Sequence, residues 1–185
     1  VGVMSSMEAG PTIADDIKEA SYWAVIGSLI VVFLYILFRF RKWQFSLGAV
    51  AAVFHDVLII LGIFSATYSF MPFNMEINQA FIAAILTVVG YSLNDTVVVF
   101  DRIREYFNEY TDWPFNKTIN SALNSTISRT VNTSLTTLIV LLAIFIFGGE
   151  SIRGFMFALI IGVVVGTYSS LFIATPIMYD TAKKK

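Results

Sequence analysis

The sequence has no cysteine and little charge. Without cysteine, the chain has neither a disulfide framework nor a thiolate site. Charged residues make up 14% of the 185 residues, whereas a soluble domain has about 25%. The net charge of -1 gives no basic excess, so no nucleic-acid partner is expected. One histidine cannot form a metal site alone, and no nucleophile–base pair or phosphate loop is present, so neither a cofactor nor an enzyme is expected.

Long apolar runs take the place of the missing charge. Hydrophobic residues make up 57% of the chain, and the mean hydropathy is +0.75. A helix needs about 20 mainly apolar residues to cross a bilayer, and it satisfies its own backbone polar groups there. The sequence therefore predicts an all-α membrane protein, with a transmembrane helical bundle over residues 13–180. Five spans qualify: 21–38, 45–70, 77–100, 126–147 and 154–178.

The two ends of the chain are not membrane-like. Residues 1–12 lack the basic-then-apolar order of a signal peptide, and the sequence begins at Val1. We interpret residues 1–12 as the end of a truncated outer domain and a linker, which leads into a helix from about Ile13. A disordered cut end is the alternative. Residues 181–185 form a basic tail.

Most basic residues fall on one side of the predicted spans. Short loops rich in Lys and Arg remain in the cytoplasm. The sequence therefore predicts a cytoplasmic C-terminus and an outward N-terminal end. Nine of the twelve Lys and Arg residues lie on the predicted cytoplasmic side: Arg39, Arg41, Lys42, Arg102, Arg104, Lys117, Lys183, Lys184 and Lys185.

Asp95 lies inside the third span. It precedes Asp101 by six residues, or ~9 Å of helix. A carboxylate at the centre of a membrane helix costs about 2.5–3.5 kcal/mol on insertion scales. The fourth span enters the membrane from the same side and carries Arg129 near its start. We therefore predict that Asp95 and Arg129 lie at similar depths and form a pair.

Polar side chains accompany this pair at helical spacing. Asn94 belongs to a polar stripe with Asp95, and Thr133 and Thr137 follow Arg129. Two interpretations are open. The pair is either a static element in which hydroxyls join helices, or a proton site in which Arg129 holds the ionised Asp95 and the hydroxyls carry water.

Two further polar residues, His55 and Asp56, lie near the middle of the second span. As neighbours in a helix they point about 100° apart, so one narrow face cannot hold both. Asp56 is expected to face the protein interior, as intramembrane carboxylates do. A functional intramembrane polar site and a satisfied structural group are equally consistent with this pattern.

Small residues in the predicted spans indicate close helix packing. Gly162, Gly166 and Ser170 repeat every four residues, which lets helix backbones approach one another. Gly90, in the third span, is expected to play the same role.

Five stretches of the chain carry a recognisable pattern: "GPTIADDIKEA", "GAVAAVFHDVLIILGIF", "ILTVVGYSLNDTVVVFDRIRE", "STISRTVNTSLTT" and "FGGESIRGFMFALIIGVVVGTYSSLFIATPI". Together they resemble the SecF family of bacterial protein-export membrane proteins. The resemblance runs from about Gly10 to Pro176, and "NDTVVVFDRIRE" is similar to SecF rather than to its paralogue SecD. It implies five helices of a six-helix half-bundle of the resistance-nodulation-division type, preceded by a first helix and a periplasmic domain.

The resemblance also implies a function in the inner (cytoplasmic) membrane. Members of the family are expected to couple inward proton flow to preprotein export, with the positions of Asp95 and Arg129 in the proton pathway. The implied partners are SecD, the SecYEG channel, YajC and YidC, besides preproteins, protons and membrane lipids. Two alternatives remain open: half of a proton-driven small-molecule efflux transporter, and a non-transporting scaffold for the translocon.

Overall fold

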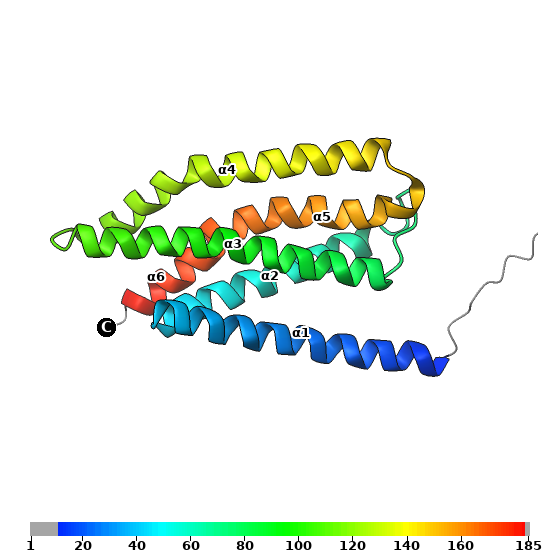
Figure 1. The fold of residues 1–185 in the computed structure, drawn as a ribbon, viewed down its shortest axis with the longest axis horizontal. Helices are drawn as coiled ribbons and strands as arrows, with labels where there is room; N and C mark the ends of the chain where they lie inside the picture. The colour runs from blue at the N-terminus through cyan, green and yellow to red at the C-terminus, as the bar shows by residue number, and fades with distance from the viewer. Residues whose placement is uncertain (1–10, 184–185) are drawn as a thin grey trace, which may run out of the picture.

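Helices that run up and down form the described part of the chain, residues 11–183 of this computed structural model. Figure 1 shows that the α1–α2 turn, the α3–α4 turn and the C-terminus lie at one end of the bundle. Most basic residues named above therefore lie at that end. The elements are α1 (Pro11–Phe40), α2 (Trp43–Thr67), α3 (Gln79–Glu109), α4 (Phe115–Phe147), α5 (Glu150–Ser169), the π-helical turn η1 (Ser170–Ala174) and α6 (Thr175–Lys183).

The helices confirm the predicted all-α membrane fold. Four helical segments in the described chain are long and apolar enough to cross a membrane, namely α2, α3, α4 and the α5–η1–α6 segment, and α1 adds a shorter apolar stretch at Ile26–Phe40. Residues 1–10 of the predicted outer segment lie outside the described residues, as do the last two residues of the basic tail. Pro11 and Thr12, which were assigned to a linker, already belong to α1.

Local sequence signals explain where α3 begins and where the next helix starts. The Asn78 side chain accepts a hydrogen bond of 3.1 Å from the Phe81 backbone N–H, which caps the start of α3. At the other end, α3 extends past its predicted span to Glu109. Pro114 lacks a backbone N–H and precedes the first residue of α4. The helices thus reach beyond the apolar spans at this end.

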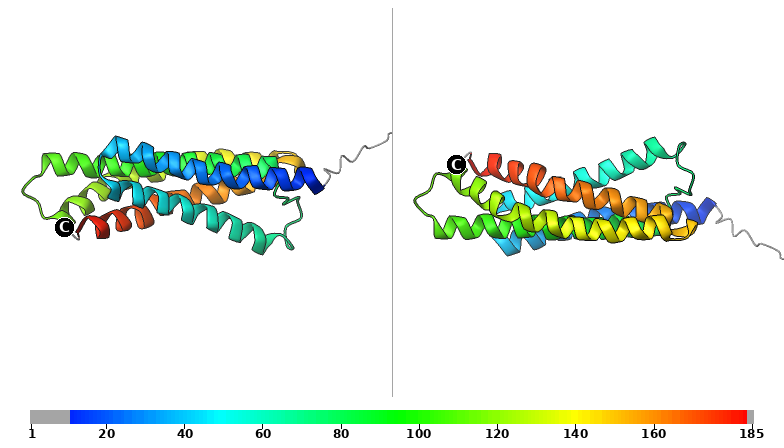
Figure 2. Two further views of the ribbon diagram at one scale, coloured as in Figure 1. Left: turned by 90° about the horizontal axis from the view of Figure 1, so that it is seen from below. Right: turned by 90° about the horizontal axis from the view of Figure 1, so that it is seen from above.

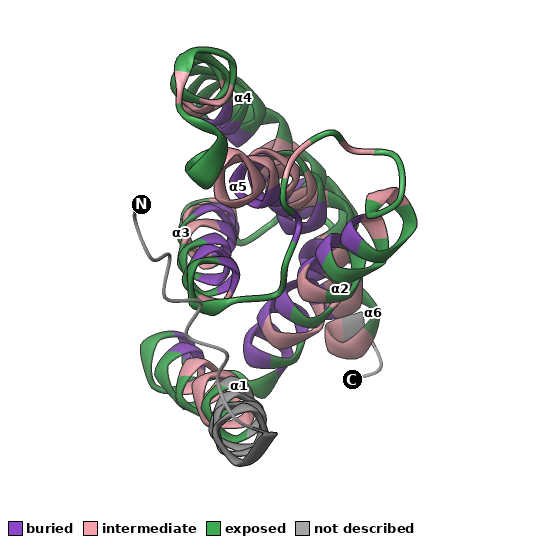
Figure 3. Cartoon of the chain, turned by 90° about the vertical axis from the view of Figure 1, so that its right-hand side faces the viewer, coloured by how far each residue is buried: buried purple, intermediate pink, exposed green. Residues whose placement is uncertain are grey.

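The α2, α3 and α5 helices form the centre of the bundle. Figure 3 shows buried residues on these three helices, with α4 and α1 at opposite edges. The α4 helix packs on α3 and α5, and α1 packs on α2. Figure 2 shows α2 diverging from the other helices toward its C-terminal end. Only 11% of the apolar 18-residue stretch of α4 is buried, so most of this helix is left uncovered by the described chain.

Two apolar clusters lie on either side of a polar layer. One contains Phe40, Phe45 and Phe100, where the Phe45 and Phe100 rings meet edge to face with centroids 5.0 Å apart. The other contains Phe64 and Phe81, whose ring centroids are 4.5 Å apart. On α3 and α5, buried polar residues occupy the positions between these clusters. The layer, with its α2 and α6 members, consists of Asp56, Ser92, Asp95, Thr96, Ser169, Ser170 and Thr175.

Glycines on α5 bring it close to α3. A Cβ at Gly162 would overlap the Val88 side chain, and a Cβ at Gly166 would lie 3.0 Å from the Ser92 Cβ. Gly90 does not behave as expected, because nothing lies within 4 Å of its Cβ position. It points to an exposed face of α3 and brings no helices together within the described part of the chain.

We expect Gly162→Ala to destabilise the protein by about 1–3 kcal/mol, because the added methyl group overpacks against Val88. Gly90→Ala is the matched control, and it should be neutral or stabilising by up to about 1 kcal/mol, since the site is open and alanine favours helix. Thermal unfolding of the complete protein in detergent measures both changes. Equal stability of the two variants would contradict the close α3–α5 contact.

Candidate functional site

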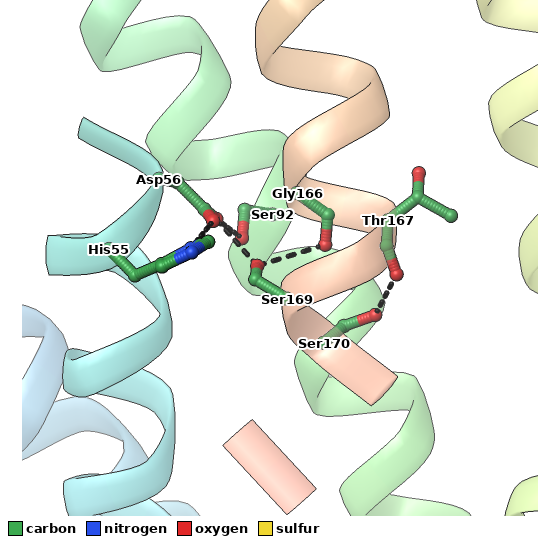
Figure 4. A network of polar contacts seen from close by, with 7 residues as sticks. All are labelled: His55, Asp56, Ser92, Gly166, Thr167, Ser169 and Ser170. Carbon is green, nitrogen blue, oxygen red and sulfur yellow. Dashed lines mark hydrogen bonds and ion pairs between the residues drawn. The ribbon is translucent and has the colours of Figure 1, made fainter. Parts of the chain in front are cut away.

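The Asp56 carboxylate is a hydrogen-bonded hub in the polar layer. Its side chain is 1% exposed. Its Oδ2 accepts hydrogen bonds from the Ser92 hydroxyl on α3, at 2.6 Å, and from the Ser169 hydroxyl on α5, at 2.7 Å. Figure 4 shows these side chains converging on Asp56 from three helices. One carboxylate therefore joins α2, α3 and α5.

His55 reaches the same carboxylate from its own helix. Its Nδ1 lies 3.1 Å from the Asp56 Oδ1. The two residues leave α2 in different directions, as expected, but the length of the imidazole side chain closes the gap. The His55 side chain is 31% exposed, and its ring centroid lies 6.4 Å from that of Tyr168. His55 therefore connects the buried hub with the periphery of this chain.

Asp95 is a second buried carboxylate, but its surroundings are different. It lies one helical turn beyond Ser92 on α3 and is 5% exposed. Its Oδ2 has no hydrogen-bond partner of good geometry in the described chain, and the buried hydroxyl of Thr130 on α4 lies beside the carboxylate. A buried polar atom without a partner costs about 1–3 kcal/mol. Such a group is suited to taking up a proton.

Arg129 does not pair directly with Asp95, so the predicted contact is wrong for this chain. No N–O distance of 4.0 Å or less joins the two side chains, although Arg129 attracts the carboxylate electrostatically. The reason is the rotation of α4. Thr130 points inward and is 1% exposed, which turns the preceding residue about 100° away. Arg129 is consequently exposed.

The exposed Arg129 lines a polar cavity between α3 and α4. The cavity has a volume of about 480 Å³ and lies at the end of the bundle that carries the α3–α4 turn. Charged side chains of both signs surround it. Its lining consists of Val98, Asp101, Arg102, Glu105, Ser125, Thr126 and Arg129. Arg129 therefore lies between a polar opening and the buried layer.

Of the remaining expected site residues, Asn94 and Thr133 are exposed and Thr137 is half-buried. Asn94 is exposed, on a different side of α3 from Asp95. The Thr133 hydroxyl donates to the Arg129 carbonyl at 3.0 Å, and the Thr137 hydroxyl donates to the Thr133 carbonyl at the same distance. Both hydroxyls are thus satisfied within α4. They form no polar file with Asp95 inside this chain.

Other hydroxyls connect α4 with its neighbours. The Ser134 oxygen accepts hydrogen bonds from the Tyr91 hydroxyl, at 3.2 Å, and from the Thr167 hydroxyl, at 2.6 Å. The Ser170 hydroxyl donates to the Thr167 carbonyl at 3.0 Å. Sequence analysis did not single out Ser92, Ser169 or Thr167. The available signal was the position of Ser92, three residues before Asp95 on the predicted third span.

Together these groups form a cluster of ionisable side chains and hydroxyls inside the bundle. Two carboxylates and one imidazole lie in or beside the layer, and hydroxyls surround them. Among the described residues, no group of three or more His, Cys, Asp or Glu is placed to hold a metal ion. Ionisable groups inside membrane helices typically mark ion or proton pathways.

Comparison with known proteins identifies relatives of this chain. Residues 2–184 match the family described as "Protein export membrane protein SecD/SecF, C-terminal". The chain is 56% identical over 178 residues to the protein translocase subunit SecF of Rhodothermus marinus, covering 96% of this chain and 58% of that protein. It is 46% identical over 175 residues to the SecDF of Brucella abortus, covering 95% of this chain and 22% of that protein.

A solved structure shows the same fold. The crystal structure of SecDF from Thermus thermophilus, a translocon-associated membrane protein, matches with a TM-score of 0.86 and 39% sequence identity. The match covers 96% of this chain and 24% of that chain. The likeness therefore extends over nearly the whole of this chain.

The two carboxylates should respond differently to the same substitution. Asp56→Asn should destabilise the protein by about 1–3 kcal/mol, because it weakens the acceptor shared by Ser92 and Ser169. Asp95→Asn should change stability by less than about 1 kcal/mol, because one carboxylate oxygen has no partner to lose. Thermal unfolding of the complete protein in detergent shows which of the two variants is less stable, and we expect it to be Asp56→Asn. The reverse order would contradict the hydrogen-bonding difference between the carboxylates.

Proposed function

The chain belongs to the SecD/SecF family of protein export membrane proteins, and from this premise we propose that it is the membrane bundle of a SecF subunit that couples proton flow to preprotein export. The observation that carries the proposal is the buried Asp95 carboxylate, whose Oδ2 lacks a hydrogen-bond partner in the described chain. The chain spans 58% of the Rhodothermus SecF. Export itself is therefore a property of the longer protein.

In the proposed cycle Asp95 alternates between a protonated and an ionised form. The protonated form removes a charge from the low-dielectric interior, and Arg129 favours the ionised form by electrostatic attraction. The cavity beside Arg129 gives water a route toward this end of the site. One charge crossing 100 mV is worth about 2.3 kcal/mol, so several protons would be needed to drive a domain movement.

The exposed face of α4 supports a second half-bundle as the partner. Only 11% of the apolar 18-residue stretch of α4 is buried in the described chain. Asn94 on α3 and Thr133 on α4 are exposed. SecDF relatives carry the matching segment within a longer chain. We assign this face to contact with SecD, which would place Asn94, Thr133 and Thr137 at the junction of the two halves.

The cellular setting follows from the same family membership. We place the bundle in the cytoplasmic membrane, with the basic end inside, and we propose SecYEG, YajC and YidC as further partners. Similarity to protein translocase subunits favours export over small-molecule efflux.

Proton-dependent preprotein export in membrane vesicles tests the function. In the complete SecD–SecF complex, Asp95→Asn should abolish the stimulation of export by the proton gradient, because asparagine cannot carry the proton. Asp112→Asn is the matched control. This residue lies in the exposed turn between α3 and α4 and should leave export unchanged. If Asp95→Asn assembles and responds normally to the gradient, Asp95 is architectural and the scaffold function is correct.

Cysteine labelling tests the proposed orientation and the cavity. The chain has no cysteine of its own, so introduced thiols can be followed against the unmodified protein. Ser125→Cys lines the cavity and should react with a membrane-impermeant reagent from the cytoplasmic side. Glu76→Cys lies in the exposed α2–α3 loop and should react only from the opposite side. If Ser125→Cys reacted only from outside and Glu76→Cys only from the cytoplasmic side, the proposed orientation would be wrong.

A further inference from the structure

We propose that Asp56 is a positioning residue for Asp95. Its carboxylate holds Ser92 on α3 and Ser169 on α5, and it thereby sets the rotation of α3 that points Asp95 toward α4. This inference rests on the proposed function of Asp95 as a proton carrier. It gives a role to Asp56, the buried carboxylate that takes no part in the proposed proton transfer.

The first support is the shape of the contact. Asp56, Ser92 and Ser169 are each 0% exposed. Both serine hydroxyls donate to the same oxygen, Oδ2, at 2.6 and 2.7 Å. Apolar side chains tolerate small rotations of packed helices, whereas two short hydrogen bonds to one atom do not. The hub therefore specifies one relative arrangement of α2, α3 and α5.

The second support is the short, rigid link from the hub to Asp95. Ser92 and Asp95 lie three residues apart on the uninterrupted helix α3, which corresponds to ~4.5 Å of rise. A rotation of α3 that breaks the Ser92 hydrogen bond also turns Asp95 by the same angle. Asp95 would then change its position relative to Thr130 and Arg129 on α4. The hub and the proton site thus share one rigid element.

The third support is the local geometry of α5. Ser169 is its last α-helical residue, and the π-helical turn η1 begins at Ser170. Such turns are rare and occur frequently at functional sites. A Cβ at Gly48 on α2 would overlap the Ala174 carbonyl oxygen of η1, so α2 also packs closely after the turn. Asp56 therefore holds α5 at the point where its helical geometry changes.

His55 completes the arrangement by fixing the other carboxylate oxygen. Its Nδ1 lies 3.1 Å from the Asp56 Oδ1. With contacts on both oxygens, the carboxylate plane cannot turn freely about its last bond. The contact with His55, on the same helix, thereby fixes the direction in which the Asp56 Oδ2 accepts hydrogen bonds from Ser92 and Ser169.

The experiment separates positioning from simple structural support. In the complete SecD–SecF complex, proton-driven export is measured as a function of pH, and the amplitude and the midpoint are fitted separately. We expect Ser92→Ala and Ser169→Ala to shift the midpoint by about half a pH unit or more, because each changes the surroundings in which Asp95 titrates. A residue that supports only folding would lower the amplitude and leave the midpoint unchanged, which would overturn the proposal.

Two further variants sharpen this measurement. Ser46→Ala is the matched control, since Ser46 is a buried serine of α2 whose hydroxyl has no partner in the described chain. It should change neither amplitude nor midpoint. Ser92→Cys keeps a side chain of similar size but provides only a weak donor, so it should give a shift smaller than that of Ser92→Ala. Equal midpoints for Ser92→Cys, Ser92→Ala and the unmodified protein would contradict the role of this hydrogen bond.

Failure of this inference differs from failure of the proposed function. If Asp95→Asn abolishes the proton response while both serine variants keep the original midpoint, only the role of Asp56 is wrong. If Asp95→Asn leaves the proton response intact, both proposals are wrong, because there is then no proton carrier to position. The serine variants each remove one hydroxyl, so the outcome does not depend on whether Asp56→Asn assembles.

Discussion

The structure depends on how buried polar groups are hydrogen-bonded inside an apolar bundle. In a low-dielectric interior an unpartnered polar atom is costly, whereas a satisfied one fixes its neighbours in place. Asp56 is of the second kind, with Ser92, Ser169 and His55 on its two oxygens. Asp95 is of the first kind, because its Oδ2 has no partner in the described chain. Ser92, which donates to Asp56 from α3, lies one helical turn before Asp95 on the same helix. The two carboxylates are therefore neighbours with opposite hydrogen-bonding states.

The helices around the polar layer differ in how closely they are packed. Apolar clusters lie on either side of it, and close packing of Gly162 and Gly166 fastens α5 to α3. In contrast, little of α4 is buried. Hydroxyl contacts at Ser134 connect α4 to α3 and α5. A fixed core of α2, α3 and α5 beside a less embedded α4 suits a site in which Arg129 approaches or leaves Asp95.

Membership of the SecD/SecF family gives this arrangement a context. The chain spans 58% of the Rhodothermus SecF and 22% of the Brucella SecDF that it matches. In the proposed cycle, protonation of Asp95 has to affect other parts of the protein through the helices. The α3 helix is suited to this because it continues from the polar layer to Glu109, beyond the apolar span.

The sequence by itself determined the helices and the identity of the intramembrane charges. Lipid forces each span to be helical, so hydropathy alone located the spans, and Asp56, Asp95 and Arg129 were visible as ionisable residues within them. Only the tertiary structure decided which groups meet. The donors to Asp56 are 36 and 113 residues away in the sequence, on helices whose rotation no local pattern reveals. The rotation of α4 turned Thr130 inward and Arg129 outward, and the rotation of α3 left Gly90 exposed. The rotation of a helix about its axis is set by packing between neighbours rather than by spacing along one chain segment.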